Sequence, residues 1–246
     1  MFSLFLLNGL KFNEKYMKYT DLLVGGLCLF CACSSPQKNP IDYVDPFIGT
    51  GFHGHTYPGA TTPFGAVQLS PDTRRGNWDA SSGYHYSDST ILGFSHTHLS
   101  GTGCQDLGDV LLRPTTQPVR LEGEGDIFLP AAFSHDSEKA TPGYYAVTLA
   151  DEQIKVELAA STFAGMHRYA YLNDKDASVI VDLTHILNTD DFIYEAELKQ
   201  TADNEIVGMR RTRSWVDNQY IYFVLQFSKS IQEWQQLNDK QGVAHF

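Results

Sequence analysis

Runs of β-branched and aromatic residues, several of them alternating with polar residues, dominate the chain between residues 109 and 228. One example is Tyr220-Ile221-Tyr222-Phe223-Val224-Leu225, in which successive side chains would point to opposite faces of a sheet. The pattern predicts strands at Asp109–Pro114, Tyr144–Ala150, Ile154–Ser161, Met166–Leu172, Ser178–Leu183, Glu197–Thr201, Glu205–Trp215 and Gln219–Phe227. The turn residues Asp151-Glu152 and Ala202-Asp203-Asn204 each predict a hairpin between the strands that flank them.

The flanking regions differ from this strand-rich part. Residues 41–108 are rich in Gly, Pro, Thr, Ser and His, which predicts long loops with special backbone angles. Ile231–Asn238 is compatible with a short helix, and Val243–Phe246 with the start of a further strand. Many short strands with little helix indicate an all-β sandwich formed by residues 42–246. Since the chain stops inside an apparent strand, we expect the sandwich to lack its last strands.

Composition and charge exclude some partners. Hydrophobic residues make up 42% of the chain and charged residues 19%, as in a globular protein. The formal net charge of −11 disfavours nucleic acid and anionic membrane surfaces, which would repel an acidic chain. Neutral ligands such as sugars suit this charge.

The first 41 residues have the pattern of a targeting segment. Lys18 precedes a short apolar stretch, Leu22–Phe30, that is too short to cross a bilayer and matches the hydrophobic part of a secretory signal. Leu29-Phe30-Cys31-Ala32-Cys33 resembles a bacterial lipobox with Cys33 as the lipidated residue. We therefore expect a lipoprotein signal peptide with an upstream extension at 1–33, a polar tether at 34–41, and a membrane-anchored lipoprotein in the periplasm or at the cell surface. The alternative is a buried N-terminal helix.

The cysteines and glycines exclude several chemistries. Three of the four cysteines crowd the apolar segment, so they are not a disulfide framework, and only Cys104 lies in the body of the chain. No Gly-x-Ser-x-Gly elbow accompanies Cys104 or the serines. The Gly-Thr-Gly segments lack the spacing of dinucleotide and phosphate loops.

Candidate ligand chemistry is concentrated between residues 45 and 104. Trp78 is the best candidate for stacking on a pyranose ring, and His53, His55, His96 and His98 are candidates for lining a sugar pocket. Aromatic faces, imidazoles and backbone groups at glycine are the groups that contact sugar rings and hydroxyls. Each histidine could instead bond only to its own loop. The two His-x-His pairs also suggest a zinc-dependent hydrolase, but no Cys-x-x-Cys, His-Glu-x-x-His or clear carboxylate partner accompanies them.

Several of these loops together resemble the N-terminal domain of glycoside hydrolase family 92, which comprises bacterial α-mannosidases. The similar stretches are Asp45-Pro46-Phe47-Ile48-Gly49-Thr50, His55-Thr56-Tyr57-Pro58-Gly59-Ala60, Pro63-Phe64-Gly65, Gln68-Leu69-Ser70-Pro71-Asp72, Ser82-Gly83-Tyr84-His85-Tyr86, Gly93-Phe94-Ser95-His96-Thr97-His98-Leu99-Ser100-Gly101-Thr102-Gly103, Pro142-Gly143-Tyr144-Tyr145 and His167-Arg168-Tyr169. The string from Gly93 to Gly103 is the most specific of them.

The resemblance implies an exo-acting, inverting α-mannosidase of two domains, a supersandwich-like β-sandwich and a larger (α/α)6 barrel. In that family a Glu acid, an Asp base and the ligands of a Ca²⁺ ion belong to the barrel, while the sandwich supplies loops that shape the sugar pocket. This chain is far shorter than family members, and the whole barrel is absent from it. We therefore expect no catalytic residue and no metal ligand here, and we expect mannose-containing glycans and the missing barrel as partners. The alternative is a stand-alone, glycan-binding surface lipoprotein.

Overall fold

The computed structural model describes residues 38–121, 127, 129–173 and 176–246. Residues 40–43 form a short 3-10 helix, η1 (Pro40–Tyr43), and Val44–Phe246 forms a separate compact unit. The signal peptide expected at 1–33, its lipidation site Cys33 and the first half of the tether, residues 34–37, lie outside the described residues. No described helix is long and apolar enough to span a bilayer.

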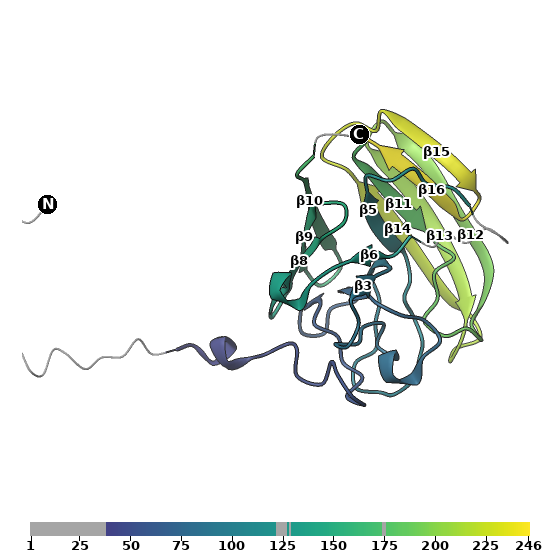
Figure 1. Cartoon of the computed structure of the whole chain (residues 1–246). Helices are drawn as coiled ribbons and strands as arrows, with labels where there is room; N and C mark the ends of the chain where they lie inside the picture. Colours follow the sequence, from purple (N-terminus) through teal and green to yellow (C-terminus); the bar gives the residue numbers. More distant parts are fainter. Residues whose placement is uncertain (1–37, 122–126, 128, 174–175) are drawn as a thin grey trace, which may run out of the picture. The chain divides into compact units, whose positions relative to one another are not determined.

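The compact unit is a β-sandwich built on a seven-stranded antiparallel sheet (Figure 1). Its strands, in spatial order, are β1 (Ala60–Thr61), β2 (Gln68–Asp72), β4 (Gly93–Ser95), β5 (Leu111–Thr115), β11 (Ser178–Asp182), β16 (Gln241–His245) and β15 (Glu233–Asn238). Phe94, Leu112 and Val181 lie opposite one another on three of these strands, so they share one face of the sheet.

Two smaller sheets cover that face. The four-stranded sheet has the order β10 (Gly165–Tyr171), β9 (Ile154–Ala160), β8 (Tyr144–Leu149) and β7 (Lys139–Thr141), and the three-stranded sheet has the order β12 (Phe192–Ala202), β13 (Glu205–Arg213) and β14 (Gln219–Gln226). The first packs on Leu69 and Phe94, and the second on Leu112, Val179 and Val181. Figure 1 shows β8–β10 on one side and β12–β13 on the other, with β5 and β11 drawn between them.

Short elements connect these layers. A fourth sheet pairs β3 (Thr90–Ile91) with β6 (Ala131–Ala132), and two further 3-10 helices are η2 (Trp78–Ala80) and η3 (His135–Ser137). On the opposite face of the large sheet, Ile180 and Val243 form a smaller apolar cluster with Val119. The described unit is therefore all-β with no α-helix, as the alternation of residues predicts, and the predicted long loops are present between β2 and β3 and between β4 and β5.

The strand predictions are confirmed with small shifts of their ends, except that β12 begins at Phe192, five residues before the predicted start at Glu197. Both predicted hairpins are present, as β8–β9 and β12–β13. The helix predicted at Ile231–Asn238 is wrong, because this segment forms β15 and pairs with β16. Gln and Leu favour a helix locally, but the Trp234 ring lies against Gly242 of β16, where any side chain would clash with it. Packing against a neighbouring strand overrides the local preference.

Candidate functional site

An exposed group of aromatic and imidazole rings surrounds Trp78. We call Phe52, His53, His55, Trp78 and Asp79 the Trp78 cluster. The Trp78 indole is 56% exposed, and its ring centroid lies 5.2 Å from that of His53 and 4.3 Å from that of His55. Phe52, also largely exposed, lies against His53 at 4.0 Å between centroids. Such a set of exposed rings is unusual for a plain surface loop.

Three polar contacts hold the Trp78 ring and its neighbours in place. Trp78 Nε1 donates to the carbonyl oxygen of Gly103 at 2.9 Å, which fixes the indole while its face stays exposed. His53 Nδ1 lies 2.5 Å from Asp79 Oδ1, so the carboxylate orients the imidazole. Asn77 caps η2 by accepting a hydrogen bond from the backbone N–H of Asp79. The cluster is therefore preorganised without a ligand.

His55 forms the inner wall of the cluster. Its backbone has a φ of 56°, in the left-handed region, and its carbonyl oxygen accepts a hydrogen bond from Gly101 at 2.6 Å. A side chain at Gly103 would come within 3.1 Å of the His55 ring, so glycine permits the two loops to approach. The ring is buried, and its Nε2 has no hydrogen-bond partner among the described residues. A buried polar atom of this kind marks a place where a ligand or water completes the structure.

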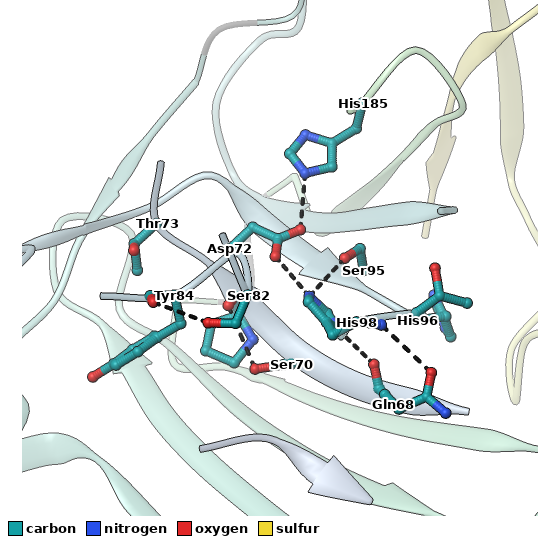
Figure 2. Close-up of polar contacts among 12 residues, drawn as sticks. Gln68, Ser70, Asp72, Thr73, Ser82, Tyr84, Ser95, His96, His98 and His185 are labelled. Carbon is teal, nitrogen blue, oxygen red and sulfur yellow. Dashed lines mark hydrogen bonds and ion pairs between the residues drawn. The ribbon is translucent and has the colours of Figure 1, made fainter. Parts of the chain in front are cut away.

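His98 belongs to a different, buried network, shown in Figure 2. Its Nε2 lies 2.7 Å from Asp72 Oδ1 and its Nδ1 lies 2.7 Å from the carbonyl oxygen of Gln68. Both neighbours are hydrogen-bond acceptors, so each ring nitrogen faces an acceptor oxygen. His185 Nε2 approaches the second oxygen of Asp72 at 2.8 Å. The network joins β2 to the loops that follow β4 and β11.

Ser95 gives this network the residue types of a catalytic triad but not its geometry. Ser95 Oγ lies 3.0 Å from His98 Nε2, the same nitrogen that faces Asp72. In a Ser-His-Asp triad the serine and the carboxylate occupy opposite nitrogens of the imidazole. The side chains of His98 and Asp72 are also fully inaccessible. The arrangement therefore positions loops and does not present a nucleophile.

The charge balance at Asp72 is set by its two histidines. Burial by itself would raise the pKa of the carboxyl, but His98 and His185 outweigh burial and hold the pKa well below its usual value of 3.8. Asp72 is therefore ionised at neutral pH. A buried carboxylate with two imidazole partners is costly to disturb.

His96 points into a third environment. Its Nδ1 donates to the carbonyl oxygen of Val110 at 2.7 Å, and its Nε2 lies 3.0 Å from His167 Nε2. The hydroxyl of Tyr169 lies 2.7 Å from the other nitrogen of His167. Burial lowers the pKa of His96 to about 4 and that of His167 well below 6.5. Both rings are therefore neutral at pH 7.

The structure thus brings together Trp78, His53 and His55 and places His96 and His98 elsewhere. The two His-x-His pairs do not behave as strand pairs, because His55 lies in a left-handed turn and β4 ends at Ser95, before the second pair begins. Within the described residues, no group of three or more His, Cys, Asp or Glu side chains could hold a metal ion. Sequence reasoning missed Phe52 and the pairing of Asp72 with His185. The position of Phe52 next to His53 is a local signal that could have revealed its role. No local sequence signal connects His185 with Asp72, which lies far from it in the chain.

The fold is that of a β-sandwich domain, with the Trp78 cluster outside its strands. Residues 43–245 match the Glycosyl hydrolase family 92 N-terminal domain, and the chain belongs to this family. It is 30% identical over 193 residues to an uncharacterized secreted glycosidase of Arthroderma benhamiae, a match that covers 71% of this chain and 24% of the relative.

Solved structures agree with this assignment. The family GH92 α-mannosidase BT3965 from Bacteroides thetaiotaomicron, solved alone and with mannoimidazole, matches with a TM-score of 0.77 and 36% identity. The match to the structure solved alone covers 84% of this chain and 31% of that enzyme. The inverting mannosidase BT2199 of the same organism has the same fold, with a TM-score of 0.63 and 22% identity over 85% of this chain and 30% of that enzyme. This chain therefore spans less than a third of the length of these relatives.

Proposed function

We propose that this chain is the sandwich part of a Ca²⁺-dependent, inverting exo-α-mannosidase and that its Trp78 cluster contacts the mannose ring. The main observation behind this proposal is that the Trp78 side chain is held in place by the carbonyl of Gly103 and yet is 56% exposed. The similarity to an α-mannosidase that was solved with mannoimidazole supports mannose as the sugar.

The geometry suits recognition of a neutral sugar. The exposed face of Trp78 can cover the C–H groups on one side of a pyranose, and covering about three such groups contributes about 2 kcal/mol, or about thirtyfold in Kd. His53, oriented through Nδ1 by Asp79, directs its Nε2 away from that carboxylate and toward a sugar hydroxyl. His55 forms the buried wall of the proposed site, and its unpaired Nε2 is available to hydrogen-bond a sugar hydroxyl.

Hydrolysis itself is assigned to the part of the enzyme that this chain does not match. Inversion requires an acid and a base about 6.5–9.5 Å apart on opposite sides of the sugar. In the Trp78 cluster the one carboxylate, Asp79, is engaged with His53. Among the described residues no group of three or more His, Cys, Asp or Glu side chains could hold a metal ion, and we assign the calcium ion to the barrel.

Titration with methyl α-D-mannopyranoside, followed by calorimetry and saturation-transfer NMR, tests the sugar contact. We expect weak binding by the full chain, with a Kd in the millimolar range, because half of a pocket binds weakly. Trp78→Ala should weaken it by about thirtyfold, whereas Trp215→Ala, which removes an equally exposed indole elsewhere, should leave it unchanged. Equal affinities of the two variants would contradict the proposal.

Supplying the missing part tests the assignment of catalysis. The chain mixed with a separately produced barrel of a family 92 mannosidase should release mannose from a p-nitrophenyl α-mannoside, and neither part should do so alone. Hydrolysis by the purified chain alone would refute the assignment of catalysis to the barrel. Submillimolar binding of mannose oligosaccharides without a barrel would instead favour the stand-alone glycan-binding lipoprotein.

The membrane anchor is a proposal that concerns Cys33. A lipidated Cys33 would hold the domain at the periplasmic or outer surface, in keeping with a relative described as secreted. Mass spectrometry of the chain expressed in a Gram-negative host should find acyl groups on Cys33 and none in Cys33→Ser. Recovery of the unmodified chain in the soluble fraction would exclude the anchor.

A further inference from the structure

A groove separates the two sheets that cover the large sheet. It has a volume of about 510 Å³ and is bounded by β10 on one side and by β14 with the segment that follows it on the other. We call it the β10–β14 groove. His96, Leu112 and Val179, from or beside strands of the large sheet, form its floor. The covering layer of the sandwich is therefore interrupted at this place.

Both walls of the groove are strand edges. Among the described strands, β10 pairs only with β9 and β14 pairs only with β13, so each leaves one edge without a partner. The free N–H and C=O groups of such edges favour pairing with another strand. Tyr169 packs against the apolar clusters beneath both sheets, which places it at the junction between them. A strand inserted here would make one continuous layer from the two sheets.

The floor of the groove offers little to a sugar. The hydroxyl of Tyr171 donates to the carbonyl oxygen of Ser178 at 2.6 Å, and that of Tyr169 is bonded to His167. The nitrogens of His96 are occupied by Val110 and His167. Because these polar groups are satisfied internally, they are not free to bind hydroxyls, and the floor acts as an apolar surface. The hydrogen-bonding capacity of the groove lies in its two backbone edges.

We propose that the β10–β14 groove binds one extended strand of a family 92 enzyme, from the part of the polypeptide that this chain does not match, and that this strand pairs with β10 and β14 together. The proposal rests on the proposed function, since it concerns how the sandwich joins the rest of such an enzyme. The relatives hold more than two thirds of their length in that part. Among the lining residues the charged ones are Arg168, which is paired with Glu157 of β9, and Lys229, so the strand should have an acidic outward side chain beside Lys229 and apolar inward ones.

Overlapping ten-residue peptides from the unmatched part of BT3965, labelled with a dye, test this proposal by fluorescence anisotropy with the full chain. At least one peptide with alternating apolar residues should bind with a micromolar Kd. N-methylation of alternate residues removes the donors to one neighbouring strand and keeps the side chains. For a strand inserted between two edges, both alternate sets of N-methyl groups should each weaken binding by at least tenfold.

Variants and self-association measurements complete the test. Lys229→Glu should weaken the binding of an acidic peptide by about threefold. Lys199→Glu, on β12 at the far edge of the sheet that contains β14, should leave the binding unchanged. If no peptide binds the folded chain, or if only one N-methylated set loses binding, the proposed insertion is wrong. Sedimentation showing a dimer that peptides displace would assign the groove to a second copy and would also overturn it. Mannoside titration of the same sample separates these outcomes from failure of the proposed function.

Discussion

Acid should destabilise this domain through the His96–His167 pair, and the size of the effect follows from the structure. The unfolded chain binds a proton on His96 near pH 6.5, whereas burial lowers the pKa in the folded chain to about 4. Between these values the unfolded state holds more protons, so the free energy of unfolding falls as the pH falls. From pH 7 to pH 5 the loss amounts to about 2 kcal/mol for His96 alone.

The surroundings of the pair explain why it resists protonation. His96 and His167 face each other at 3.0 Å, so a charge on one opposes a charge on the other. His98 also opposes a charge on His96, while the smaller effects of Asp72 and Asp109 favour it. Because the two rings interact, they titrate as a pair rather than singly.

Urea unfolding at pH 7, 6 and 5 of the wild type and of His96→Gln/His167→Gln measures the effect. The wild type should lose at least about 2 kcal/mol more than the double variant over this range, whatever the two stabilities at pH 7. The comparison of slopes removes the contributions of the other titratable groups, which both proteins share. Equal losses in both proteins would refute the reasoning that the pair is buried in its neutral form.

Further predictions concern the buried network and the thiol. In urea titrations at pH 7, Asp72→Asn should lower the free energy of unfolding by about 3 kcal/mol, because it leaves two buried imidazoles without their carboxylate. The control Asp88→Asn, at a more exposed ion pair, should lower it by less than about 1 kcal/mol. Gly83→Ala should cost at least about 1 kcal/mol by thermal unfolding, since Gly83 has a φ of 88° and a methyl group there would clash with Asp72; wild-type stability would contradict this. Cys104 should react with iodoacetamide at pH 8 more slowly than a cysteine peptide, because burial and nearby carboxylates raise the pKa of its thiol; an equal rate would be inconsistent with this environment.

The strands and the hairpins were predictable because their signals are local. Period-two alternation and turn residues act within a few positions, and β8, β9, β13 and β14 follow them closely. The segment Ile231–Asn238 shows the limit of this reasoning. Its residues suit a helix, and it becomes a strand because β16 lies beside it. A neighbour supplied by the fold decides such a case, and no local pattern contains it.

The candidate site divides in the same way. The clustering of Trp78 with His53 and His55 was predictable in outline, since aromatic, glycine and histidine residues crowd one stretch of the chain. The separation of His96 and His98 was not, because their rings are placed by partners as distant as His167 and by Asp72 on another strand. Residues far apart in sequence meet only when long-range packing brings their strands together.

The sequence by itself therefore determined the class of fold, the family and the stretch that holds the Trp78 cluster. Only the tertiary structure decided which histidines face solvent and that β10 and β14 are left with free edges across a groove. The physical reason is that a strand is specified by the spacing of its own side chains, whereas its neighbours are specified by the packing of the whole sandwich.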